Sequence, residues 1–119
     1  MHKDQIKNTV YKYITMYHDM LDENIKRVYV HINNEFECED KETEALGFVE
    51  VDQFGEAHIW FNGKFCDINP EKEVKDLIIH ELAHLFTPVS KKHGYFYNDH
   101  GKKWKEVVMM MGGNTQKWI

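Results

Sequence analysis

The segment LIIHELAHLF, residues 77–86, decides the fold and the chemistry of this chain. It contains His80, Glu81 and His84, and its other seven residues are apolar. On an α-helix, residues four apart project from one face, so the two histidines can offer their imidazoles to a single ion. Ionisable side chains without a partner are costly in an apolar segment. The pattern therefore predicts a helix that holds a metal ion.

Zinc is the metal that this pattern favours. It accepts neutral imidazole, prefers four ligands, and in catalytic sites keeps one position open for water. Glu81 lies about 100° around the helix from His80, so it can border the open position without being a ligand. We expect Glu81 to act as a general base on a metal-activated water, as in the HExxH pattern of metal-dependent peptidases. The longer HExxHxxGxxH pattern is excluded, because Thr87 and Ser90 stand where it requires glycine and histidine.

A catalytic zinc site needs a third protein ligand, and three downstream residues are candidates. His100 is favoured, because it heads the last predicted helix on that helix's apolar stripe, and an ordered element holds a ligand better than a loop does. Glu106 faces away from that stripe, and His93 lies in a loop. The predicted metal ligands are therefore His80, His84 and His100.

The rest of the chain predicts an α+β fold with a small three- to four-stranded sheet. Apolar residues have helical spacing over residues 6–21, which predicts an N-terminal helix. Three segments alternate apolar and polar residues and are rich in β-branched or aromatic side chains, as strands are: residues 27–32, 45–51 and 57–61. The Asn-Gly pair of NGKF, residues 62–65, is typical of a hairpin and predicts a short fourth strand.

Two helices follow, an active-site helix and a C-terminal helix. Asn69 is predicted as the N-cap of the first, with Pro70 as its first helical residue and Pro88 at its end. The second is predicted from near Asp99 to the glycines at 112–113. The sheet is expected to be mixed or largely antiparallel, and residues 1–119 to form one domain.

Composition narrows the function classes. The formal net charge is −5, with acidic residues gathered at 34–44 and basic residues at 91–105. No apolar run approaches the ~18 residues of a membrane helix, and the polar N-terminus is unlike a secretory signal. We therefore expect no membrane association and a cytoplasmic location. In a reducing cytoplasm, Cys38 and Cys66 are expected to be free thiols.

The site region resembles the SprT-like metalloprotease domain. HELAHLF is followed, after a loop, by HGKKWKEVVMMMGG, and that family pairs HExxH with a downstream His-Gly-x-x-aromatic motif that opens the next helix. The upstream strand HIWFN is similar too. The resemblance covers residues 57–113, and residues 1–56 only in the order of elements.

The resemblance implies a zincin-like fold and zinc-dependent proteolysis of protein substrates, including proteins crosslinked to DNA. Carried onto this chain, it makes His80, His84 and His100 the zinc ligands and Glu81 the general base. The chain lacks the cysteines of the zinc ribbon that family members often carry, and its net charge is acidic, so a DNA-linked role has less support than the metal site. Its length also suits a phage or mobile-element protein.

Other interpretations remain open at this point. The histidines could be core residues bonded to backbone carbonyls, the zinc could be purely structural, or the reaction could be hydrolysis of a non-peptide substrate. A non-catalytic, metal-stabilised module could use residues 91–105 to bind nucleic acid or a protein partner. His58 is expected to be a half-buried strand residue rather than part of a cleft edge. Tyr95 and Tyr97 are expected to pack the loop rather than stabilise an oxyanion.

Overall fold

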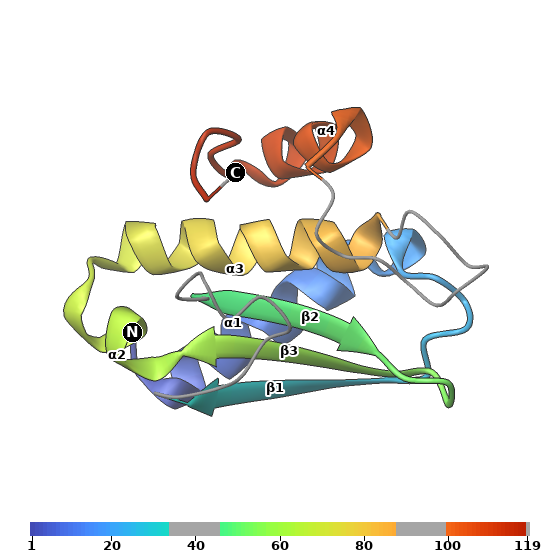
Figure 1. Cartoon of the computed structure of the whole chain (residues 1–119), viewed down its shortest axis with the longest axis horizontal. Helices are drawn as coiled ribbons and strands as arrows, with labels where there is room; N and C mark the ends of the chain where they lie inside the picture. The colour runs from blue at the N-terminus through green and yellow to red at the C-terminus, as the bar shows by residue number, and fades with distance from the viewer. Residues whose placement is uncertain (34–45, 88–99, 119) are drawn as a thin grey trace.

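The computed structural model describes residues 1–33, 46–87 and 100–118. Within these residues one helix and a 3₁₀ turn, His18–Met20, precede three strands and three further helices. In chain order the labelled elements of Figure 1 are α1 (Lys3–Met16), β1 (Arg27–Asn33), β2 (Gly47–Val51), β3 (Glu56–Asn62), α2 (Gly63–Ile68), α3 (Glu71–Phe86) and α4 (Lys102–Met111). This order confirms the predicted α+β class.

The described strands form a mixed sheet in the order β1-β3-β2. β1 pairs with β3 in parallel, and β2 pairs with β3 antiparallel. The turn between β2 and β3 is held by Asp52, whose Oδ1 accepts hydrogen bonds from the backbone N–H groups of Phe54 and Glu56. Gly55 in this turn has a φ of 79°, a left-handed conformation that glycine adopts without steric cost. β3 is therefore the central strand and β2 an edge strand among the described residues.

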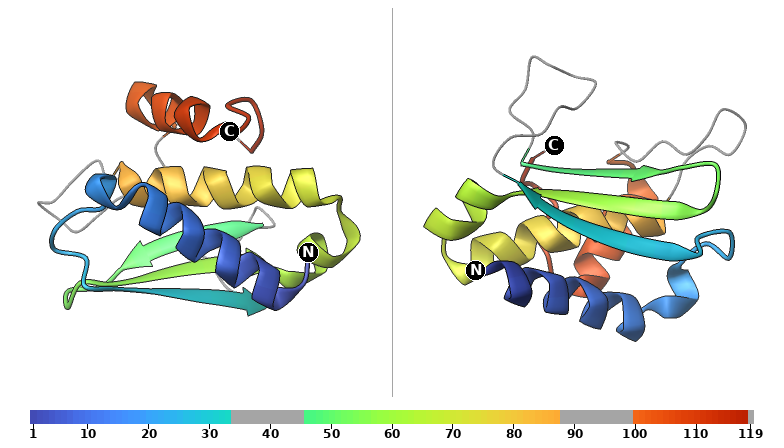
Figure 2. Two further views of the ribbon diagram at one scale, coloured as in Figure 1. Left: turned by 180° about the vertical axis from the view of Figure 1, so that it is seen from behind. Right: turned by 90° about the horizontal axis from the view of Figure 1, so that it is seen from below.

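The core lies between the sheet and two helices. Along β3, Ala57, Ile59 and Phe61 are buried and alternate with half-buried residues, so the apolar face of the strand points toward the helices. α1 and α3 lie on this side of the sheet, and Figure 2 shows the three strands in front of α3 when the molecule is seen from below. α4 packs on the far side of α3 (Figure 1). α3 is thus covered on both sides, which explains its long apolar run.

Two local predictions differ from the structure. The NGKF segment does not form a strand: the Asn62 side chain accepts a hydrogen bond from the backbone N–H of Phe65 and caps α2. The sheet has three described strands, within the predicted three to four. Asn69 donates from its side chain to the carbonyl of Phe65 and closes α2, and Pro70 is the cap of α3, one residue later than predicted. The predicted stop at Pro88 lies outside the described residues.

The C-terminal helix also begins later than predicted. α4 starts at Lys102 with Gly101 as its cap, so His100 precedes the helix instead of heading it. Asp99 lies outside the described residues. The helix ends at Gly112, whose φ of 83° forms the left-handed C-cap.

Two further expectations concern single features. Cys66 is buried as a free thiol, as predicted, and Cys38 lies outside the described residues. Within the described ranges, none of the helices has the length and apolar character needed to cross a bilayer.

Candidate metal centre

The three histidines predicted as ligands come together between α3 and α4. His80 and His84 project one turn apart from α3, and His100 reaches them from the residue before the cap of α4. Their Nε2 atoms form a small triangle: 3.3 Å separates His80 from His84, 3.1 Å separates His84 from His100, and 3.3 Å separates His100 from His80. His80 and His84 are buried, and His100 is half-buried.

The size of this triangle fits a tetrahedral metal ion. Zinc binds imidazole nitrogen at ~2.0–2.1 Å, and two ligands of a tetrahedron at that distance lie about 3.3–3.4 Å apart. Three imidazole nitrogens facing a common point also leave lone pairs directed at one another, which a cation relieves. The donor set and its spacing therefore fit a three-histidine metal site with one position left for another ligand.

The environment keeps His80 and His84 in the protonation state that can bind a metal. Burial, and then the neighbouring His100, lowers the pKa of His80 to about 4. Burial, and then the two other histidines, lowers the pKa of His84 to about 2. Both rings are thus neutral at physiological pH, and a neutral imidazole is the form that coordinates a metal.

Glu81 lies beside the triangle rather than in it. Its Oε1 atom is 3.9 Å from Nε2 of His80, and the side chain is buried. Burial raises the pKa of this carboxyl group to about 8. A carboxyl group with a raised pKa next to a metal site is suited to accept and return a proton near neutral pH.

Trp104 of α4 is packed against all three histidines. Its ring centroid lies 4.9 Å from that of His80, 5.5 Å from that of His84 and 4.6 Å from that of His100. Its indole N–H donates to the backbone carbonyl of His80 at 3.2 Å. Trp104 belongs to the face of the last helix that the sequence predicts to be buried. Its contacts fix α4 on α3, and this packing places His100 next to His80 and His84.

A glycine that the sequence analysis did not single out borders the catalytic candidate. Gly47 is the first residue of β2, and a Cβ atom placed on it would lie 2.8 Å from Cγ, Cδ and Oε1 of Glu81. Only a glycine leaves room for the carboxylate in this position. No local sequence signal marks it, because the contact joins residues that are distant in the chain.

The other candidate residues are not part of the triangle. Glu106 is exposed on α4, in agreement with its predicted outward direction. His58 is half-buried on β3, as predicted, and its Nδ1 atom lies 2.8 Å from Nε2 of His31. Because β3 pairs on both sides, its strand cannot be the edge that accepts a peptide. His93, Tyr95 and Tyr97 lie outside the described residues.

The chain was compared with protein families, curated proteins and solved structures. Neither the curated proteins nor the solved structures gave a match. A profile described as the SprT-like family matches residues 10–117, a range that includes the helix α3, the residue His100 and the helix α4. By this match over most of its length, the chain belongs to the SprT-like family.

Proposed function

We propose that this protein is a zinc-dependent peptidase that hydrolyses peptide bonds in protein substrates. The observation that carries the proposal is the triangle of three Nε2 atoms with a buried carboxylate beside it. His80, His84 and His100 would hold the ion. A zinc ion bound there would act as a Lewis acid that polarises a carbonyl group and lowers the pKa of water.

Glu81 performs the proton transfers in this mechanism. Its carboxylate takes a proton from the attacking water and gives it to the leaving amine of the substrate. The pKa of about 8 applies to the site without a cation. A positive charge nearby favours the ionised carboxylate and lowers that pKa, so that Glu81 can start the reaction as a base.

The sheet offers a place for an extended peptide. β2 has one neighbour among the described strands, and its first residue, Gly47, contacts Glu81. A peptide that added by backbone hydrogen bonds to the edge of β2 that no described strand occupies would pass the catalytic carboxylate. We therefore propose β2, and not β3 with its residue His58, as the strand that pairs with the substrate.

The test compares Glu81→Gln with wild type and with Glu106→Gln, an exposed site on α4 that serves as a matched control. Zinc content is measured by elemental analysis, and turnover with fluorescein-labelled casein. We expect about one zinc per chain in all three proteins, and a loss of turnover of at least about 10²-fold in Glu81→Gln alone. If Glu81→Gln binds zinc and keeps its turnover, Glu81 is not the general base. Bound zinc without cleavage in wild type would support a structural metal.

A second candidate is a metal-stabilised module that binds nucleic acid. Lys102, Lys103 and Lys105 are exposed on α4 and could contact phosphates. This function predicts salt-dependent binding of single-stranded DNA that Glu81→Gln leaves unchanged, with no cleavage of casein. An absence of salt-dependent binding would count against it.

A further inference from the structure

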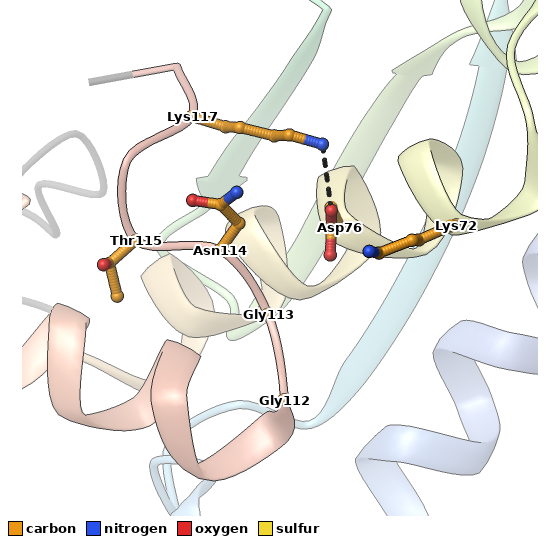
Figure 3. A pocket seen from close by; sticks show the side chains of 7 residues that line it. All are labelled: Lys72, Asp76, Gly112, Gly113, Asn114, Thr115 and Lys117. Carbon is orange, nitrogen blue, oxygen red and sulfur yellow. Dashed lines mark hydrogen bonds and ion pairs between the residues drawn. The ribbon is translucent and has the colours of Figure 1, made fainter.

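The segment that follows α4 returns along α3 and ends next to the metal centre. Figure 1 shows it turning back above α3, and Figure 3 shows it from close by. Gly112 ends α4 in a left-handed conformation. Gly113 then lies so close to α3 that a Cβ atom on it would be 2.6 Å from Cγ2 of Ile79. The second glycine therefore lets the chain contact α3 directly.

Two ion pairs attach this segment to α3. Nζ of Lys117 lies 2.7 Å from Oε2 of Glu73 and 3.0 Å from Oδ2 of Asp76. Asp76 is buried, so it depends on this cation, since an unpaired buried carboxylate is strongly unfavourable. Figure 3 shows the Lys117–Asp76 pair at a surface pocket of about 350 Å³ between the segment and the helix.

Trp118 extends this attachment to His80. Its ring meets that of His80 edge to face with centroids 5.7 Å apart, and it also meets the ring of Phe65 at 6.0 Å. Its φ of 59° is unusual for a bulky residue and carries a cost in backbone energy. The ring contacts offset that cost. The segment is thus held at its start by Gly113, and at its end by Lys117 and Trp118.

His80 has one nitrogen that the metal site does not use. Nε2 faces the other two histidines, whereas Nδ1 is buried and no group of the described residues meets it with the geometry of a full hydrogen bond. The backbone of Lys117 lies within hydrogen-bonding reach of this ring. Its carbonyl oxygen is the backbone atom that can accept a hydrogen bond from a ring N–H. Histidines that bind metal almost always donate their second N–H to a carbonyl, carboxylate or water.

We infer that residues 112–118 position His80 for metal binding, with the Lys117 carbonyl accepting the Nδ1–H hydrogen bond and Trp118 fixing the plane of the ring. The inference rests on the metal centre of the proposed function but not on its catalysis. Lys117 is a positioning residue in this arrangement: its side chain anchors the segment, and its backbone supplies the acceptor. Orientation of a ligand by such a contact raises its affinity for the metal and fixes its tautomer.

The test measures zinc affinity by competition with a chelator in Lys117→Met, Lys117→Arg and Lys75→Met. Lys75 pairs with Glu71 on the same helix, so Lys75→Met makes the same substitution at an exposed ion pair of α3 without touching the segment. We expect Lys117→Met to bind zinc about 10–100-fold more weakly, Lys117→Arg to regain most of the affinity, and Lys75→Met to match wild type. Wild-type affinity in Lys117→Met, or the same loss in Lys75→Met, would overturn the inference.

A second measurement separates positioning from folding and from catalysis. Imidazole ¹⁵N spectra of the metal-free protein report which nitrogen of His80 carries the proton, whether or not zinc binds. We expect the Nδ1–H form in wild type and a mixture of both forms in Lys117→Met and in Trp118→Leu, which leaves Asp76 paired. An unchanged tautomer in both variants would refute the positioning role. A changed tautomer in a protein that binds no zinc, or binds zinc without cleavage, would refute only the proposed function.

Discussion

Replacing Gly47 with alanine tests whether the position of the Glu81 carboxylate limits the reaction. The new methyl group would lie 2.8 Å from three atoms of the Glu81 side chain. Non-bonded carbon atoms prefer separations of about 3.5–4.0 Å, so the carboxylate must move by about 1 Å. The strand cannot easily retreat instead, because Gly47 is paired with Phe61 of β3.

A displacement of this size has a large expected effect on turnover. Moving a catalytic group by 1 Å typically costs about 10²-fold in rate. The three histidines keep their places, so the zinc content should equal that of wild type. Gly47→Ala should leave the protein folded, because the φ of Gly47 is not positive and the close contacts are with the flexible Glu81 side chain rather than with backbone. The effect is therefore expected in turnover and not in metal content.

The assay is cleavage of labelled casein by the zinc-loaded protein, with Glu50→Ala, an exposed position on the same strand, as the control. The double variant Gly47→Ala/Glu81→Gln completes a mutant cycle. If Gly47 acts through Glu81, alanine should cost nothing further once the carboxylate is gone. Turnover of Gly47→Ala within about twofold of wild type, or a full additive loss in the double variant, would refute the reasoning.

Four other predictions concern stability. In the metal-free protein, the pKa of Glu81 is raised to about 8, so the folded state keeps a proton that the unfolded chain has lost, and the free energy of unfolding should fall as pH rises. From pH 7 to 8, where His80 and His84 are neutral, the fall should be about 1 kcal/mol in wild type and absent in Glu81→Gln, as measured by urea unfolding. Between about pH 4 and 6.5 the lowered pKa values of those histidines act in the opposite direction, and stability should rise with pH. Zinc at a hundredfold excess over its dissociation constant should add about 2.7 kcal/mol to wild type, and His100→Ala should lose most of this gain in thermal unfolding. Trp104→Phe removes the hydrogen bond to the His80 carbonyl and should cost about 1 kcal/mol, and an unchanged midpoint in urea would show that this bond contributes nothing.

The histidine pair was predictable because a single helix sets its geometry. His80 and His84 need no information beyond helical spacing, and an apolar context marks their segment as buried. The third histidine depends on packing between two helices. The sequence predicts that His100 joins the pair, and the structure brings it there, but the prediction places it inside the last helix, whereas the helix begins two residues later. Helix ends are set by local capping, and Gly101 gave only a weak signal for it.

The Asn-Gly pair shows how one local signal fits two structures. Asn-Gly is favoured in hairpin turns because both residues tolerate positive φ. Asparagine is equally favoured as a helix cap, because its side-chain oxygen accepts a backbone N–H. At Asn62 the second use prevails, and the chain enters α2. Buried Cys66 and partly buried Phe65 give this helix its contact with the core, which a local pattern could not reveal.

Residues that orient the side chains of the site are much harder to predict from the sequence than the side chains that form it. The side chains proposed as metal ligands and general base must belong to a few residue types, so His80 and Glu81 stand out against an apolar background. Gly47 serves by having no side chain, and the role inferred for Lys117 uses its backbone together with an ordinary lysine charge. Neither is chemically distinctive, and each acts across a long separation in the chain. Reactive groups can therefore be found from residue type and spacing, whereas the contacts that orient them appear only when the fold brings their partners together.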